Sequence, residues 1–150
     1  MGTEIIGIDH IYLSVRSIER SEAFYDKVLL RVLGFKKSSF VLGDDAHVQY
    51  FNRLLGLVLR PARRDTGAHD PYAPGLHHLC FRVQEAVDVD RVAAELEASG
   101  VEVTGPKAFR EYAPDYYAVF VNDPDGIRLE ITNFREERRR RMEHWGADAG

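Results

Sequence analysis

Residues 8–15 of this chain are IDHIYLSV, and apolar and polar side chains alternate along them. Strict alternation is typical of a β-strand that buries one face and leaves the other open. The pattern returns at residues 78–83, which are HLCFRV. This repetition divides the chain into two similar halves, and it decides the fold that we predict.

Each of these strands is followed by a stretch with apolar residues at helical spacing. The first stretch covers residues 17–33, with Ser17 suited to cap its start and Gly34 suited to end it. The second covers residues 88–99 and ends at Gly100. Further strands are expected at residues 35–42, 47–51 and 54–59 in the first half, and at 101–104, 116–122 and 127–133 in the second. Both halves therefore have the predicted order β-α-β-β-β.

The two halves are expected to form a single domain, because a unit of roughly 60 residues is too small to bury a good core alone. We predict an α+β fold with two βαβββ modules, at about residues 5–60 and 76–134. The modules would pair into one curved, open-barrel mixed sheet with the helices on its outer face. A linker rich in Pro, Gly and charge covers about residues 61–75, and a tail helix is expected at about 135–146.

Composition and charge exclude several classes of protein. The 150 residues are 45% hydrophobic, and 20 Lys and Arg against 24 Asp and Glu give a net charge of −4, which disfavours a nucleic-acid partner. The basic run REERRRR at residues 135–141 contains acids and is expected to form a solvated helix. The sequence has no apolar run of membrane-spanning length and no secretory signal, and its single cysteine, Cys80, fits a reducing compartment. We therefore expect a cytoplasmic protein without membrane or nucleic-acid partners.

The sheet face opposite the helices is expected to carry the chemistry. On that face, three strands each contribute one good metal ligand: His10, His78 and Glu130. Two neutral imidazoles and one carboxylate on rigid strands can occupy one face of an octahedral ion and leave positions for substrate, water or dioxygen. Alternation alone does not decide whether the three side chains converge, because that depends on how the halves pair.

Two of these assignments have competitors. His77 is adjacent to His78, but it shares the face of the apolar residues in its strand, so a structural or rim role is expected for it. Glu130 has Arg82 and Arg128 as alternative partners. A carboxylate in the middle of a strand needs a cation nearby, and a metal ion would serve.

Three side chains near the predicted cavity are candidates for proton transfer or oxyanion stabilisation: Tyr12, His47 and Tyr117. If DPDG at residues 123–126 closes a hairpin, Val119 lies opposite Glu130 and Tyr117 points into the cavity. The imidazole of His47 suits an acid or base. Packing or a rim hydrogen bond is the alternative role for the two tyrosines.

Three arginines also share the predicted cavity face: Arg60, Arg82 and Arg128. Their guanidinium groups suit a carboxylate or phosphonate on a small-molecule substrate. They are equally suited to balance acidic side chains at the ends of the sheet, and the sequence leaves both roles open.

Together with FY at residues 24–25, GLHHLCFRV at 75–83 and DPDGIRLE at 123–130, the opening strand resembles the vicinal oxygen chelate superfamily. This superfamily includes glyoxalase I, extradiol dioxygenases, fosfomycin-resistance enzymes and bleomycin-binding proteins. The likeness covers about residues 5–134. It implies paired βαβββ modules, often in a homodimer, and a divalent metal (Fe, Mn, Zn or Ni) that chelates two neighbouring substrate oxygens. By this resemblance His10, His78 and Glu130 fall on the ligand positions.

One position departs from the pattern of glyoxalase I. The residue of the first half that matches Glu130 is approximately Val58, where glyoxalase I carries a carboxylate as fourth ligand and base. Three-ligand members, the extradiol dioxygenases and fosfomycin-resistance enzymes, fit better, although typical extradiol enzymes have four modules. The expected function is a metal-dependent enzyme. The alternatives are a metal-free small-molecule binding protein of the bleomycin-resistance type and an interaction protein.

Overall fold

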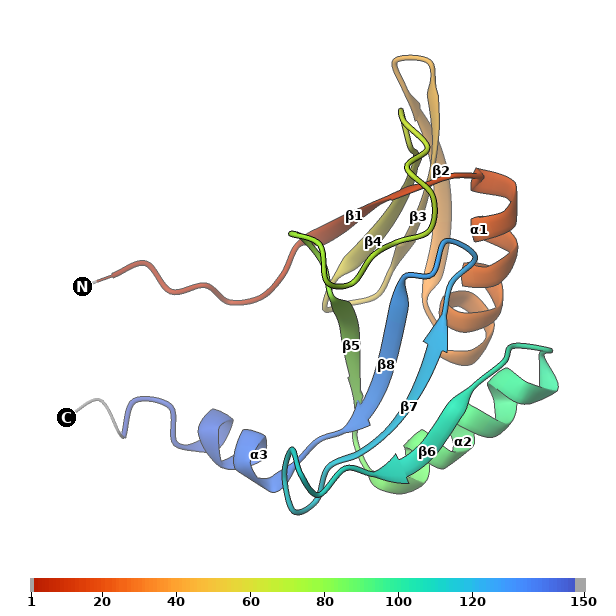
Figure 1. The fold of residues 1–150 in the computed structure, drawn as a ribbon. Coiled ribbons are helices and arrows are strands. Elements are labelled where there is room, and N and C mark those ends of the chain that lie inside the picture. The colour runs from red at the N-terminus through yellow and green to blue at the C-terminus, as the bar shows by residue number, and fades with distance from the viewer. Residues whose placement is uncertain (1, 148–150) are drawn as a thin grey trace. The chain divides into compact units, whose positions relative to one another are not determined.

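A computed structural model describes residues 2–147, and its elements follow the predicted order (Figure 1). Within these residues the chain forms, in order, β1 (His10–Val15), α1 (Ile18–Tyr25), the π-helical segment η1 (Asp26–Val32), β2 (Lys36–Leu42), β3 (Asp45–Phe51), β4 (Gly56–Pro61), β5 (His78–Val83), α2 (Ala86–Ala98), β6 (Thr104–Ala108), β7 (Tyr117–Asn122), β8 (Arg128–Asn133) and α3 (Glu136–Glu143). The α+β class with two βαβββ modules is confirmed.

The strands form two four-stranded mixed sheets with the same topology. The first sheet has the order β1-β4-β3-β2, and the second has the order β5-β8-β7-β6. In each sheet the first and last strands of the module pair in parallel, while the other neighbours are antiparallel. In the described residues no strand ladder joins the two sheets.

Each sheet carries its own helix on one face. In the first module α1 packs against β3 and β4, and in the second α2 packs mainly against β7 and β8. The predicted alternation holds in β1, where Leu13 and Val15 are buried while His10 and Tyr12 are exposed. The polar residues of β1 therefore lie on the face that α1 does not cover.

The chain forms two compact units, and their boundary does not follow the sequence order. One unit holds the chain up to His69 together with the turn Asp123–Gly126, and the other holds the remainder. In the first unit the Tyr25 hydroxyl donates to Asp123 at 2.9 Å. Arg16 donates to both carboxylate oxygens of Asp125, from its backbone N at 3.0 Å and its Nε at 2.8 Å.

Local interactions explain where the elements differ from the sequence-based boundaries. The helix expected at 17–33 changes at Asp26 to π-helical hydrogen bonding, as in the 3.0 Å bond from Leu33 N to Val28 O. The strand expected at 54–59 begins only at Gly56, because the Asn52 side chain accepts from the backbone N of the two residues before Gly56, at 2.8 and 3.0 Å. The strand expected at 101–104 lies instead at Thr104–Ala108.

The helices of this protein are short. The longest α-helix, α2, has 13 residues. Over residues 2–147, none of the helices combines the length and apolar character needed to cross a membrane.

Candidate functional site

The second module brings two of the three predicted ligands together. His78 stands at the start of β5 and Glu130 in the middle of β8, which pair in parallel. The Nε2 atom of His78 lies 3.0 Å from Oε2 of Glu130. Glu130 is 2% exposed, so its carboxylate is held in a desolvated position with an imidazole against it.

The outer nitrogen of His78 also has a partner. Its Nδ1 lies 2.8 Å from Nδ1 of His77, which in turn contacts Tyr72 edge to face. Because two imidazole nitrogens share one proton in such a contact, His77 constrains the tautomer of His78. His77 precedes β5 and lines the same cavity as His78, so it does not share the face of Leu79 and Phe81 that its strand phase predicted. A structural or rim role for it stays a prediction.

The other oxygen of Glu130 accepts a hydrogen bond from Tyr116, a residue that sequence reasoning missed. Burial, and then the hydrogen bond to Glu130, raise the pKa of the Tyr116 phenol above its usual value. The guanidinium of Arg135 stands 4.6 Å from the centre of the Tyr116 ring. Glu130 is therefore held from two sides, by an imidazole and by a neutral phenol.

Tyr116 was missed because the predicted pairing of β7 with β8 was wrong by one residue. Glu130 lies opposite Phe120, not Val119, and Asn122 lies opposite Arg128. The turn is longer than four residues because the Asp123 side chain accepts from the backbone N of Asp125 at 2.9 Å and Ile127 also stays outside the ladder. A one-residue change of register turns every side chain of a strand to the other face.

Tyr117 therefore does not have the predicted orientation. Its hydroxyl donates to Asp90 of α2 at 2.6 Å, on the helix side of the sheet. The cavity face of β7 carries Ala118 and Phe120 instead, which cluster with Phe109 and Tyr116. The expectation that Tyr117 points into the cavity is wrong.

A cavity of about 360 Å³ opens beside Glu130, and we call it the aromatic cavity. Its aromatic lining residues are Phe109, Tyr112, Tyr116 and Phe120. Its polar lining consists of His77, His78, Arg128 and Glu130. All of these residues belong to the second unit.

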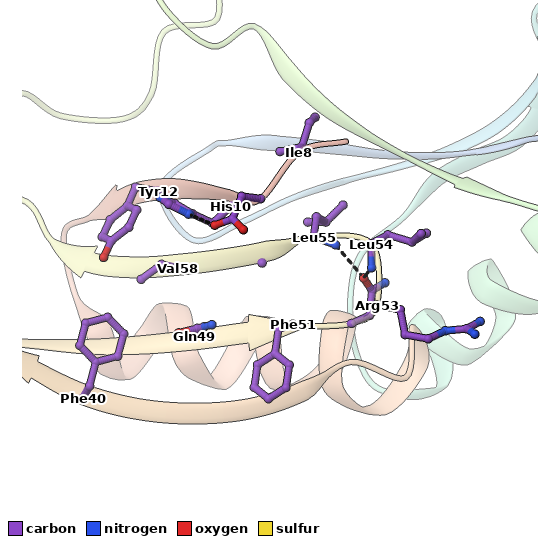
Figure 2. A pocket seen from close by; sticks show the side chains of 13 residues that line it. Ile8, His10, Tyr12, Phe40, Gln49, Phe51, Arg53, Leu54, Leu55 and Val58 are labelled. Carbon is purple, nitrogen blue, oxygen red and sulfur yellow. Dashed lines mark hydrogen bonds and ion pairs between the residues drawn. The ribbon is translucent and has the colours of Figure 1, made fainter. Parts of the chain in front are cut away.

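His10 lies in the first unit, on the edge of a second cavity of about 500 Å³ (Figure 2). Its Nδ1 lies 2.6 Å from Oδ2 of Asp9, so Nε2 is the ring nitrogen that can bind a ligand. Tyr12 lines the same cavity, and Figure 2 shows its ring at one end with Phe40, while Arg53 and Leu54 lie at the other. Both His10 and Tyr12 thus have the face that alternation predicted.

His47 does not reach the surface of this cavity. Its ring is 1% exposed and stacks on Phe40 at 4.7 Å between centroids. Nδ1 lies 2.9 Å from the backbone oxygen of Asp45, and Nε2 is buried without a hydrogen-bond partner in the described residues. A buried ring of this kind does not contact substrate, so the structure gives no support to an acid or base role for His47.

Only one of the three arginines lies in the aromatic cavity. Arg60 is held by Asp45 at 2.5 Å in the first unit. Arg82 stands over the Phe134 ring at 4.0 Å. Arg128 lines the cavity beside Glu130 and stands over the Phe120 ring at 4.0 Å. Of the three, only Arg128 lines a cavity together with Glu130.

Cys80 pairs with Glu130 across β5 and β8. Although the residue is exposed as a whole, desolvation of its sulfur and then the charge of Glu130 raise the pKa of the thiol to about 12. The thiol is therefore protonated at neutral pH and is a poor nucleophile.

The position that matches Glu130 in the first module is Val58. Tyr12 pairs with Val58 across β1 and β4, just as Cys80 pairs with Glu130 in the second sheet. Val58 is 3% exposed. Within the described residues, no group of three His, Cys, Asp or Glu side chains is gathered for a metal ion, so the candidate centre is a pair of ligands in the second unit.

Comparisons with known proteins agree with this architecture. The chain is 26% identical over 128 residues to the metallothiol transferase FosB of Shouchella clausii, covering 83% of this chain and 78% of that one. It is similar, at 25% identity and a TM-score of 0.72, to a glyoxylase/bleomycin resistance protein/dioxygenase domain from Frankia, covering 88% and 100% of the two chains.

A further likeness concerns the fold alone. The fosfomycin resistance protein FosX of Listeria monocytogenes, solved with Mn(II) and sulfate, matches at 18% identity and a TM-score of 0.63, covering 91% of this chain and 98% of that one. The family model for the Glyoxalase/Bleomycin resistance protein/Dioxygenase superfamily matches residues 7–131. The chain therefore belongs to the glyoxalase/bleomycin resistance protein/dioxygenase superfamily.

Proposed function

We propose that this protein is a divalent-metal-dependent enzyme that acts on a small substrate with two neighbouring oxygens. The observation that carries the proposal is the pair of His78 and Glu130, with a nitrogen and a carboxylate oxygen 3.0 Å apart on paired strands. A buried carboxylate needs a cation or hydrogen-bond donors, and an ion between these two groups would satisfy it.

The donor set fits Fe, Mn, Zn or Ni. Imidazole nitrogen and carboxylate oxygen suit these metals, and a site with three protein ligands leaves positions open for substrate. We propose His10 as the third ligand on the family resemblance of its position alone. Its Nδ1 is engaged by Asp9, so Nε2 would be the nitrogen that binds an ion. The similarity to a metallothiol transferase supports both the metal dependence and the enzymatic role.

When bound, the metal would act as a Lewis acid on the substrate oxygens. The side chains around it have separate tasks. The Tyr116 hydroxyl donates to Glu130 and fixes the orientation of the carboxylate, while His77 fixes the tautomer of His78. Arg128, in the same cavity, is placed to bind an anionic group of the substrate.

The proposal is tested by metal affinity. Chelator-treated protein is titrated calorimetrically with Mn²⁺ and Zn²⁺, and His10→Ala, His78→Ala and Glu130→Ala are each expected to weaken binding at least about tenfold. His144→Ala, at the exposed end of α3, is the control and is expected to leave affinity unchanged. Unchanged affinity in both His78→Ala and Glu130→Ala would overturn the proposal and favour a metal-free binding protein.

The likeness to the superfamily also leads us to infer a homodimer as the working form. Light scattering on purified protein tests this inference, and the expected mass is that of two chains. A monomer with full metal affinity would contradict it. The cytoplasmic location expected from the single cysteine stays a prediction.

A further inference from the structure

We propose that the aromatic cavity binds a planar aromatic carboxylate, with the ring against the aromatic wall and the carboxylate on Arg128. This inference deepens the proposed function, because it names the substrate class of the same site. One part of it rests on the proposed function: the two neighbouring oxygens of the substrate would point toward His78 and Glu130. Its remaining support comes from the wall, the charge and the size of the cavity.

One side of the cavity, the aromatic wall, consists of Phe109, Tyr112, Tyr116 and Phe120. Phe109 is in edge-to-face contact with Tyr116 and Phe120, at centroid distances of 6.2 and 5.4 Å. Tyr112 stacks on Phe109 with an angle of 12° between the rings. Rings in such a cluster prefer further aromatic partners in offset or edge-to-face geometry, and a flat ligand supplies one.

The aromatic residues of the cavity differ in how deeply they are buried. Phe109 and Phe120 are buried, and their packing alone explains their apolar character. Tyr112, by contrast, is 65% exposed and still lines the cavity. A ring that stacks on the core through Phe109 but stays largely exposed in the cavity suits contact with a bound ring.

Arg128 supplies a positive charge without a carboxylate partner. Its guanidinium stands over Phe120 at 4.0 Å, and in residues 2–147 no ion pair to it is found. Arg60, Arg91 and Arg139, by contrast, are each paired with an acid. A half-buried guanidinium in a cavity favours an anionic group, and its planar fork matches a carboxylate.

Size and composition separate this ligand class from others. A volume of about 360 Å³ falls at the small end of ligand cavities, which suits a single ring with its substituents. A small aliphatic phosphonate would satisfy Arg128 but leave the aromatic wall without a partner. A neutral aromatic ring would contact the wall but leave the arginine unpaired.

The test uses salicylate, which has a ring, a carboxylate and a neighbouring hydroxyl. Binding to the full chain is followed by calorimetry, with and without Mn²⁺. Catechol, which lacks the carboxylate, and methylphosphonate, which lacks the ring, are compared under the same conditions. We expect salicylate to bind more tightly than either.

Two variants assign the contacts. Arg128→Met keeps a long unbranched side chain and removes the charge, and it is expected to weaken salicylate about tenfold while leaving catechol unchanged. Tyr112→Ala removes an exposed ring and is expected to weaken salicylate and catechol alike, by about fivefold. Arg91→Met and Trp145→Ala, which change an exposed arginine and an exposed aromatic outside the cavity, are the matched controls.

The outcomes distinguish this inference from the proposed function. Two results would overturn the inference and leave the proposed function standing, provided that metal affinity is normal. One is tighter binding of methylphosphonate than of salicylate, and the other is salicylate affinity that is unchanged in both variants. Salicylate binding that responds to both variants in a protein without metal affinity supports the inference and contradicts the proposed function.

Discussion

The two modules share one backbone plan, and the last strand of each carries a different side chain at the position of Glu130. In both, the first strand pairs in parallel with the last, and the register is the same: His10 lies opposite Gly56, and His78 lies opposite Arg128. Two residues further along the last strand, the first module has Val58 and the second has Glu130. Both side chains are buried.

Both modules therefore place a buried side chain at the same point of the last strand, and the identity of that side chain determines the chemistry of the site. The second module surrounds its carboxylate with His78 and Tyr116. In the first module the equivalent position is apolar and lines a cavity with Tyr12 and Phe40. Under the proposed function, this one residue would decide which module provides two metal ligands and which provides one.

Exchanging Val58 and Glu130 is expected to change the free energy of unfolding more than the other variants do. The change is expected to be larger for Val58→Glu than for Glu130→Val. Val58→Glu places an acid in an apolar position without a cation, and we expect it to lower the free energy of unfolding of metal-free protein by about 3 kcal/mol. Glu130→Val removes a buried charge and is expected to change stability by less than about 2 kcal/mol, while metal affinity is lost.

Denaturant titration of metal-free protein measures both changes, with Val58→Gln as the neutral control of the same size as glutamate. A Val58→Glu variant as stable as the unmodified protein would contradict the comparison, because it would show that the first module tolerates a buried acid as well as the second. Partial recovery of Val58→Glu on adding Zn²⁺ would sharpen the comparison, because it would make the first module a second source of a carboxylate ligand.

The next largest change in stability is expected from removing a tyrosine–aspartate hydrogen bond, of which we compare one in each unit. Tyr25 donates to Asp123 inside the first unit, where both residues are buried, while Tyr117 donates to Asp90 at an exposed site in the second. Tyr25→Phe is expected to cost about 1–3 kcal/mol, since it removes a donor from a buried carboxylate. Tyr117→Phe is expected to cost less than about 0.5 kcal/mol, and equal losses in denaturant titrations would contradict this ranking.

Alkaline pH is expected to separate the same two sites. Burial, and then the charge of Asp123, raise the pKa of Tyr25 well above its usual value near 10, whereas in the unfolded chain it returns to that value. The stability that Tyr25 contributes is therefore complete below about pH 10 and is lost as pH rises further. Unfolding free energies measured from pH 8 to 11 should fall at the upper end, and less steeply in Tyr25→Phe than in Tyr117→Phe.

The smallest change in stability is expected from removing an ion pair of α3, a helix that has no counterpart in the first module. Its ion pairs from Arg140 to Glu136 at 2.9 Å and from Arg141 to Glu137 at 3.1 Å join exposed side chains four residues apart. Arg141→Ala is expected to change stability by about 0.5 kcal/mol or less. A loss above about 1 kcal/mol in a thermal or denaturant titration would mean that Arg141 has a partner other than Glu137.

Much of the site could be predicted from the sequence because strand periodicity is a local property. Alternation around His10 and His78 assigned both to the face away from the helices, and the repeat located Val58 at the position of Glu130. The pairing of β7 with β8 could not be obtained in this way. It depends on the Asp123 side chain, which extends the turn, so that Tyr116 rather than Tyr117 reaches Glu130.

Burial depth was the other property that the sequence did not provide. His47 alternates in phase with the open face of its strand, yet Phe40 stacks over its ring from the neighbouring strand. The contacts that occupy Arg60 and Arg82 likewise come from residues distant in sequence. Which arginine remains available to a ligand is decided by such tertiary contacts, and periodicity contains no information about them.

The turn Asp123–Gly126 has a consequence for synthesis of the chain. A nascent polypeptide that has reached His69 contains every strand of the first sheet but neither acid that receives the hydrogen bonds of Tyr25 and Arg16. Completion of the first unit therefore waits until the ribosome has added Gly126, when most of the second unit has already been synthesised. The last strand of the second sheet, β8, follows at Arg128–Asn133, so the first unit receives its last turn and the second its last strand within a few residues of each other, late in translation.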